Sequence, residues 1–125
     1  MIPNSQQTVL LIEDDPSFIY LIQRYSEKSG WRMVCTSLGE EALALVRTEA
    51  PTVVVLDIAL PGINGWEVLR TLKGESDTCG VPVVMCSGTE EVKQSLEAGA
   101  DAWLQKPIRY QEFVDVLTGV GMRQG

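Results

Sequence analysis

Short apolar runs alternate along the chain with segments in which apolar residues recur at helical spacing. Three runs are strongly apolar and rich in β-branched residues, a pattern typical of parallel strands covered on both faces: Val9–Ile12, Val53–Leu56 and Val81–Cys86. Two weaker runs, Arg32–Thr36 and Ala102–Gln105, are predicted to be the edge strands of the same sheet, because the most apolar strands belong in its centre.

Segments with helical periodicity separate these runs. A first helix is predicted from Pro16 to near Gly30, because proline is favoured at the first helical position and glycine just past the last. The other predicted helices span about Leu38 to Glu49, the segment of Trp66, Leu69 and Leu72, the segment from Glu90 to Ala98, and the segment of Phe113, Leu117 and Val120.

This order, a strand followed by a helix five times, predicts an α/β fold with one parallel sheet, helices on both faces and right-handed crossovers. With the most apolar strands in the centre, the expected strand order is 2-1-3-4-5, the flavodoxin-like doubly wound (βα)5 sandwich. The length of 125 residues fits a single domain spanning residues 1–125. We expect a core from about residue 8 to residue 120 and short flexible ends, with Gly119–Gly125 as a frayed tail or the start of a linker.

The composition excludes several kinds of function. The chain has 17 acidic and 10 basic residues and a formal net charge of −7, which opposes direct binding to nucleic acid or anionic lipid. It contains no histidine, so catalytic triads, histidine general bases and histidine-ligated metal sites are impossible. Any chemistry must come from carboxylates, hydroxyls, lysine or cysteine.

The cysteines and the amino terminus bear on the cellular compartment. Cys35, Cys79 and Cys86 are odd in number and lack C-x-x-C spacing, so they indicate neither a disulfide framework nor a zinc cluster. Cys35 and Cys86 lie in apolar runs and are predicted to be core residues, whereas Cys79 lies in a polar loop. Because there is no signal-peptide pattern and no apolar run near the ~20 residues of a membrane span, we expect a cytoplasmic protein without a membrane partner.

Polar residues follow the predicted strands, at the sheet edge where doubly wound folds bind their ligands. They are Glu13, Asp14 and Asp15 after the first strand, Asp57 after the third, Ser87 and Thr89 after the fourth, and Lys106 after the fifth. Carboxylates this close repel one another unless a cation lies between them, and oxygen ligands select a hard ion such as Mg²⁺. The pattern therefore predicts a magnesium site at this edge.

A purely structural interpretation competes for some of these residues. Asp15 directly precedes Pro16, the position of a helix N-cap, and considered alone it fits a cap better than a metal ligand, although both roles can coexist. Ser87 alone would be an ordinary turn residue. Asp57 differs because it follows four large apolar residues, where no cap is required and desolvation is costly. A functional role is therefore favoured for Asp57.

Four segments together resemble the receiver domain of two-component response regulators: LLIEDDP at 10–16, VVVLDIALPGINGWEVL at 53–69, VPVVMCSG at 81–88 and AGADAWLQKP at 98–107. They occur in order with suitable spacing, and the resemblance covers Val9 to about Val120. It implies a phosphorelay signalling domain, not an enzyme, whose own chemistry is limited to Mg²⁺-dependent self-phosphorylation and autodephosphorylation. The phosphodonor would be a histidine kinase or a histidine phosphotransfer protein.

The resemblance also implies roles for the acidic residues. Asp57 resembles the phosphate-accepting aspartate of the family, and Asp14 and Asp15 resemble its acidic pair. Asp15 would bind Mg²⁺ directly and Asp14 through water, with Mn²⁺ as a possible substitute. The backbone carbonyl of Ala59, two residues after the acceptor, would be a further ligand.

Other residues resemble the switching elements of the family. Ser87 would bond the phosphoryl group, Lys106 would pair with it, and the Lys106–Pro107 peptide bond would be cis. Trp103 stands where the family usually has a rotating Tyr or Phe, and its larger ring disfavours a full inward rotation. The interval from Ser87 to Gly99 is about one helical turn shorter than usual, which places the departures on the output side.

The expected output surface is the face formed by the fourth helix, the fifth strand and the fifth helix, with Trp103 at its centre. Its expected partner is a downstream protein.

Three alternatives are weighed against the receiver function. A flavin phosphate would be repelled by Glu13, Asp14 and Asp15, and an aspartate-nucleophile phosphatase would need a second acid at Ala59. An interaction module that keeps the receiver fold without phosphorylation stays open, opposed only by the intact acidic pocket.

Overall fold

The computed structural model describes residues 6–88, 94 and 97–122, with side-chain surroundings up to residue 120. It contains a five-stranded parallel sheet in the order β2-β1-β3-β4-β5, which confirms the predicted topology. The strands are β1 (Thr8–Ile12), β2 (Arg32–Thr36), β3 (Val53–Asp57), β4 (Val83–Ser87) and β5 (Ala102–Gln105). The weaker apolar runs form the two edges, as expected.

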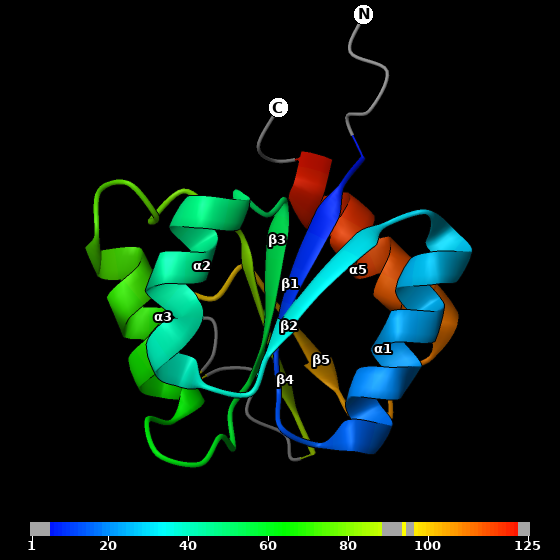
Figure 1. Ribbon diagram of the computed structural model, residues 1–125, viewed down its shortest axis with the longest axis horizontal. Helices are drawn as coiled ribbons and strands as arrows, with labels where there is room; N and C mark the ends of the chain where they lie inside the picture. The colour runs from blue at the N-terminus through cyan, green and yellow to red at the C-terminus, as the bar shows by residue number, and fades with distance from the viewer. Residues whose placement is uncertain (1–5, 89–93, 95–96, 123–125) are drawn as a thin grey trace, which may run out of the picture.

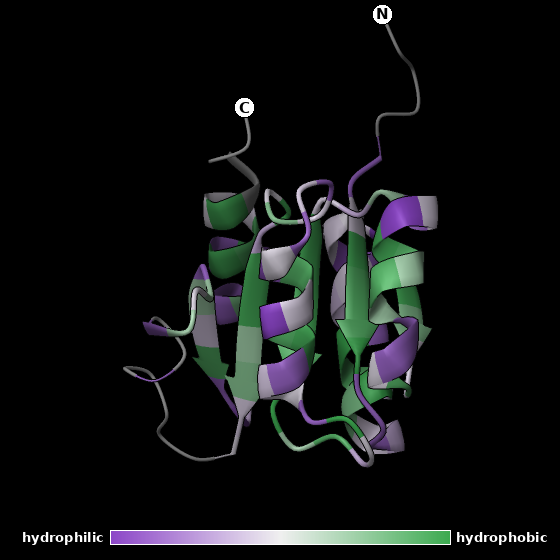
Figure 2. Ribbon diagram, turned by 90° about the vertical axis from the view of Figure 1, so that its left-hand side faces the viewer, coloured by the Kyte–Doolittle hydropathy of each residue, from purple (hydrophilic) through white to green (hydrophobic). Residues whose placement is uncertain are grey.

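Helices cover both faces of the sheet, with α2 and α3 on one side and α1 and α5 on the other (Figure 1). The helical elements are α1 (Pro16–Ser29), the 3₁₀ turn η1 (Gly39–Glu41), α2 (Ala42–Glu49), α3 (Gly65–Gly74) and α5 (Tyr110–Met122). The predicted helix from Glu90 to Ala98, and Thr89 before it, lie largely outside the described residues. Figure 2 shows the hydrophobic strands enclosed between helices whose outer surfaces are more polar.

Two apolar cores lie on the two faces of the sheet. Alternation along each strand sends successive side chains to opposite faces, so Leu10 and Val54 join the core under α2 and α3. Val9 and Val53 join the core under α1 and α5. β1, β3 and β4 are buried along their whole length, because helices cover both of their faces.

Local sequence signals explain the ends of α1. The carboxylate of Asp15 accepts a hydrogen bond from the backbone N–H of Ser17 at 3.2 Å, and Pro16 takes the first helical position. Gly30 ends the helix in the left-handed conformation, with φ of 82°, which glycine adopts without strain. Both predicted boundaries are confirmed.

Four sequence expectations need correction. α2 begins at Ala42 and not at Leu38, because Gly39–Glu41 forms a 3₁₀ turn. The fourth strand begins at Val83 and not at Val81. Cys35 is exposed and not in the core, because β2 is an edge strand; Cys86 is buried and Cys79 exposed, as predicted. The expected frayed tail is wrong for residues 119–122, which continue α5 to Met122.

Candidate functional site

The site lies where the carboxyl ends of the parallel strands meet, which we call the carboxyl edge of the sheet. β1 and β3 end there side by side. Asp57 is the last residue of β3 and is only 5% exposed. Carboxylate oxygens of Glu13, Asp14 and Asp57 lie within 4.8 Å of one another, so the three side chains could hold one metal ion. The structure thus brings together three of the carboxylates expected at this edge, Glu13, Asp14 and Asp57.

Glu13 was expected at this edge with the other acidic residues, but the sequence assigned it no individual role. Its side chain is on the same face of the sheet as Val9 and Leu11, because residues two apart along a strand share a face. The same alternation carries Asp57 onto this face from Val53 and Val55. Extending each strand pattern by one step would have paired Glu13 with Asp57.

Asp15 is a predicted metal ligand that does not belong to the cluster of Glu13, Asp14 and Asp57. Asp14 and Asp15 are both exposed, but the carboxylate of Asp15 caps α1, whereas that of Asp14 belongs to the acidic group. The chain turns from β1 into α1 at this point, and the cap requires the Asp15 carboxylate to lie over the first helical N–H groups. The geometry therefore favours the structural interpretation of Asp15.

Lys106 enters the site from the loop after β5. Its ammonium donates to Oε1 of Glu13 at 2.8 Å and lies 3.6 Å from Oδ1 of Asp57. It also lies 4.3 Å from the centre of the Phe18 ring. The backbone N–H of Lys106 donates to the carbonyl of Ser87 at 2.7 Å, which fixes the loop to β4, and the Lys106–Pro107 peptide bond is cis, as expected.

The neighbouring charges and burial at this edge shift the pKa values of Glu13 and Lys106. Burial raises the pKa of Glu13 above its usual value, although the hydrogen bond from Lys106 opposes this shift. Burial alone would lower the pKa of Lys106, but its hydrogen bond to Glu13 and the charges of Glu13 and Asp57 raise it. Its raised pKa favours the protonated form, so Lys106 is a cation between two carboxylates.

The loop after β3 holds Asp57 in place. The backbone N–H of Ala59 donates to Oδ1 of Asp57 at 3.3 Å, and the N–H of Gly65 donates to the carbonyl of Ile58 at 3.0 Å. A Cβ on Gly65 would lie only 2.7 Å from Cα of Ile58 and would also meet the carbonyl of Asp57. Only glycine allows α3 to begin this close to the strand that carries the carboxylate.

The remaining predicted residues lie on β4 and β5. Ser87 is the buried last residue of β4, and Cys86 beside it pairs in register with Asp57. Trp103 pairs with Met85 and packs, half-buried, against the core under α2 and α3. Within the described part of the chain, its buried indole N–H has no hydrogen-bond partner.

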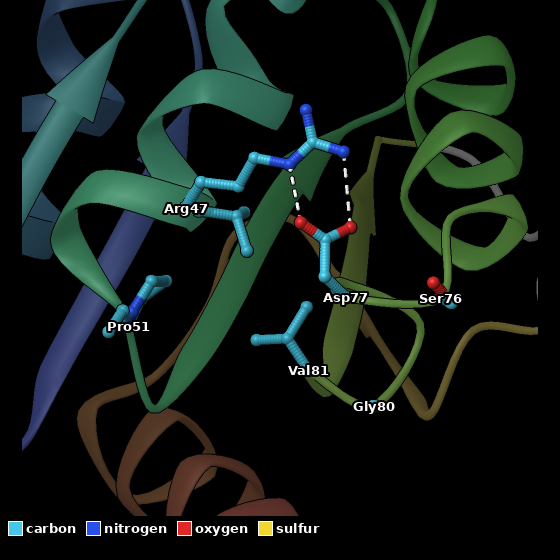
Figure 3. A pocket seen from close by; sticks show the side chains of 8 residues that line it. Arg47, Pro51, Ser76, Asp77, Gly80 and Val81 are labelled. Atoms are coloured by element: carbon cyan, nitrogen blue, oxygen red, sulfur yellow. Dashed lines mark hydrogen bonds and ion pairs between the residues drawn. The ribbon is translucent and has the colours of Figure 1, made fainter.

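A large hollow lies elsewhere, at the opposite end of the sheet, near the amino ends of β3 and β4 (Figure 3). It measures about 820 Å³ and is lined by Val46, Arg47, Ala50, Pro51, Ser76, Asp77, Gly80 and Val81. The guanidinium of Arg47 crosses it and binds Asp77 at 2.7 Å and 3.1 Å. No carboxylate cluster accompanies it in the described residues, so size alone does not identify the functional site.

Comparison with known proteins agrees with this geometry. The profile of the response regulator receiver domain matches residues 9–118. The DNA-binding response regulator MtrA of Mycolicibacterium smegmatis is 37% identical over 112 residues, 87% of this chain and 48% of that protein. The probable transcriptional regulatory protein TcrX of Mycobacterium tuberculosis is 32% identical and covers 94% of this chain and 51% of its own length. The chain thus spans about half the length of these relatives.

Solved structures show the same fold. A response regulator from Chloroflexus aurantiacus superposes with a TM-score of 0.88 at 25% identity, over 95% of this chain and 100% of that one. The receiver domain of a sensor histidine kinase from Pseudomonas aeruginosa was crystallised with magnesium in its active-site cleft. It superposes with a TM-score of 0.85 at 21% identity, over 94% of this chain and 99% of that one. None of the helices in the described residues is long and apolar enough to cross a membrane. The chain belongs to the response regulator receiver domain family.

Proposed function

We propose that the chain accepts a phosphoryl group on Asp57 from a histidine kinase or a histidine phosphotransfer protein. The observation that carries the proposal is the position of the Asp57 carboxylate: it lies at the end of a buried strand, clusters with Glu13 and Asp14, and is 3.6 Å from the ammonium of Lys106. A carboxylate oxygen of Asp57 attacks the phosphorus of the donor's phosphohistidine. The P–N bond breaks, its electron pair goes to the imidazole nitrogen, and an acyl phosphate forms on Asp57.

Transfer brings further negative charge into an acidic site, so cations must offset it. The carboxylates of Asp14 and Asp57, with Glu13 in the same cluster, would hold Mg²⁺ together with the backbone carbonyl of Ala59, and Mn²⁺ suits the same oxygen ligands. When bound, the ion neutralises charge on the transferring group and orients its oxygens. Asp15 is left out of this set because its carboxylate caps α1.

The other site residues respond to the phosphoryl group. Lys106 lies near enough to Asp57 to pair with an oxygen of the new group, and Ser87 ends the neighbouring strand, where its hydroxyl could donate to another. Movement of Ser87 would shift the residues that follow it and change the packing around Trp103 on β5. The surface of β5 and α5 would then bind a downstream protein in one state of the switch.

Phosphoryl uptake is tested directly by intact-mass measurement after incubation with acetyl phosphate and Mg²⁺. We expect a phosphorylated species in the native chain, none in Asp57→Asn and none in EDTA. A phosphorylated species that persists in Asp57→Asn would overturn the assignment. No uptake by a correctly folded native chain would instead favour a phosphorylation-independent interaction module.

A matched pair of variants tests the metal ligands. Asp14→Asn should weaken Mg²⁺ binding by at least about tenfold, because it removes a charged ligand. Asp15→Asn should leave it within about twofold, because asparagine also caps helices and the side chain lies outside the cluster. Isothermal titration calorimetry measures both, and equal losses would restore Asp15 as a ligand.

Trp103 provides a reporter of switching. In a Trp31→Phe, Trp66→Phe background, Trp103 is the sole indole, and beryllofluoride with Mg²⁺ should change its fluorescence. We expect a modest change from altered exposure, because the half-buried ring is too large to enter an unaltered pocket. An unchanged spectrum with beryllofluoride demonstrably bound would exclude this residue from the output.

A further inference from the structure

The hollow near the amino ends of β3 and β4 combines an apolar lining with an ion pair. Val46, Pro51 and Val81 supply apolar surface, and Arg47 and Asp77 supply the charges. Its volume of about 820 Å³ falls within the range of about 300 to 1,000 Å³ that is usual for ligand pockets. The hollow is therefore large enough to hold side chains of a bound partner.

Hydrogen bonds hold both walls of this hollow in place. In the loop between α3 and β4, the buried hydroxyl of Thr78 donates to the carbonyl of Leu72 at 2.7 Å. The ammonium of Lys73 donates to the carbonyl of Val81 at 3.0 Å. On the other side, Ala50 ends α2 in the left-handed conformation, with φ of 47°, and turns the chain into β3. The hollow is thus preformed, so binding there requires little ordering of the chain.

The charged groups at the hollow carry more negative than positive charge. Nε of Arg47 donates to Oδ2 of Asp77 at 2.7 Å, and Nη2 donates to Oδ1 at 3.1 Å (Figure 3). The same Nη2 donates to Oε1 of Glu75 at 3.4 Å. Two carboxylates thus share one guanidinium, which occupies only part of the about four acceptor positions on each. Together with the net charge of −7, this excess favours a cationic ligand and opposes an anionic one.

We propose that this hollow docks a basic segment of a partner protein. An arginine of the partner binds Asp77 and Glu75 in the place that Arg47 holds, and an adjacent apolar side chain of the partner packs on Val81. Arg47 itself shows that a guanidinium fits Asp77 with two hydrogen bonds, a fork that a lysine ammonium cannot offer. Arg47 is thus an internal competitor of the partner. Docking at this end of the sheet does not involve Asp57, which lies at the carboxyl edge.

Two other interpretations of the hollow predict different results. If Arg47 and Asp77 form only a surface ion pair, peptides of either charge leave the hollow unoccupied. If the hollow takes an acidic ligand, Arg47 is the group that binds it, so loss of Arg47 removes binding. The charge of the peptide that binds and the effect of Arg47→Met therefore distinguish the three cases.

The first experiment compares two blocked tripeptides in NMR titrations of the native chain. The probe is acetyl-Leu-Arg-Leu-amide, and the matched control is acetyl-Leu-Glu-Leu-amide. We expect the arginine peptide to cause saturable shifts of the backbone amides of Asp77 and Val81 in the millimolar range, because ordering a short flexible peptide costs binding free energy. No Mg²⁺ or phosphodonor is present, so the result does not bear on phosphoryl transfer. No saturation with the arginine peptide, or equal binding of both peptides, would overturn the proposal.

The second experiment repeats the titration with three variants of exposed residues, which are expected to fold. Asp77→Asn should weaken binding of the arginine peptide about tenfold, because it removes the charge from the principal acceptor. Arg47→Met should instead strengthen binding about threefold, because the internal competitor is lost. Ser76→Ala, which changes a neutral group of the lining, should leave binding within about twofold. Weaker binding by Arg47→Met would show that the hollow recognises an anion and would rule out a basic partner.

Discussion

Two ion pairs of nearly equal length lie at opposite edges of the sheet. Lys106 and Glu13 are 2.8 Å apart at the carboxyl edge, and Arg47 and Asp77 are 2.7 Å apart across the hollow at the amino edge. The environments differ: the Glu13 side chain is 1% exposed, whereas that of Asp77 is 55% exposed. The comparison therefore sets a largely buried ion pair against an exposed one.

The pKa values of the two acidic partners shift in opposite directions. The hydrogen bond from Arg47 lowers the pKa of Asp77, because at this exposed position it outweighs the opposing effect of desolvation. Burial raises the pKa of Glu13 in spite of Lys106. A short ion pair thus stabilises charge at the surface, whereas in the buried site it only reduces the cost of a charge that burial disfavours.

Lys106→Met should have the largest effect on stability. It removes the cation and leaves Glu13 buried without a counter-charge, which we expect to reduce the free energy of unfolding by about 3 kcal/mol at pH 7. Urea denaturation followed by circular dichroism measures this loss. A loss no greater than that of Arg47→Met would show that burial makes no difference between the two pairs.

The second prediction tests whether charge causes this loss. In the double variant Glu13→Gln, Lys106→Met no buried charge remains, and glutamine still offers an oxygen to the N–H groups of Asp14 and Asp15. The double variant should recover about 1.5 kcal/mol relative to Lys106→Met alone. If the double variant is less stable than Lys106→Met, packing of the lysine chain matters more than its charge.

The third prediction concerns pH. The pKa of Glu13 is raised above its usual 4.5 in the folded state, so the folded protein binds this proton more tightly than the unfolded chain. The resulting stabilisation is fully present below 4.5 and is lost as the pH rises through the raised value. The destabilisation by Lys106→Met should therefore shrink as the pH falls toward 4.5 in urea titrations. The double variant, which lacks this carboxyl, supplies the control.

The smallest effect is expected at the amino edge. Arg47→Met should change the urea midpoint little, and the change should vanish in about 0.5 M NaCl, because exposed ion pairs are screened by salt. The pKa of Asp77, measured by NMR titration, should rise toward its usual value once the hydrogen bond from Arg47 is lost. A salt-independent loss of stability would point to packing of the Arg47 methylenes over Val46 and Val81.

Most of the fold follows from local patterns in the sequence. The apolar runs predict all five strands and their order, because central parallel strands must be apolar on both faces. Asp15, Pro16 and Gly30 predict the limits of α1, since capping involves only neighbouring residues. The exposure of Cys35 could not be seen in this way, because it depends on how far the helices reach over the edge strand β2, which is a tertiary property.

The sequence by itself determined that carboxylates and a lysine meet at the carboxyl edge, because parallel strands end on the same side. It could not distinguish the roles of Glu13, Asp14 and Asp15, since three consecutive acids have nearly the same chemistry; the resemblance assigned the metal to Asp14 and Asp15 and gave Glu13 no role. The tertiary structure decided this: the start of α1 takes Asp15 as its cap, and Asp14 faces Asp57. Strand alternation turns Glu13 inward, where Lys106 arrives from the far end of the chain.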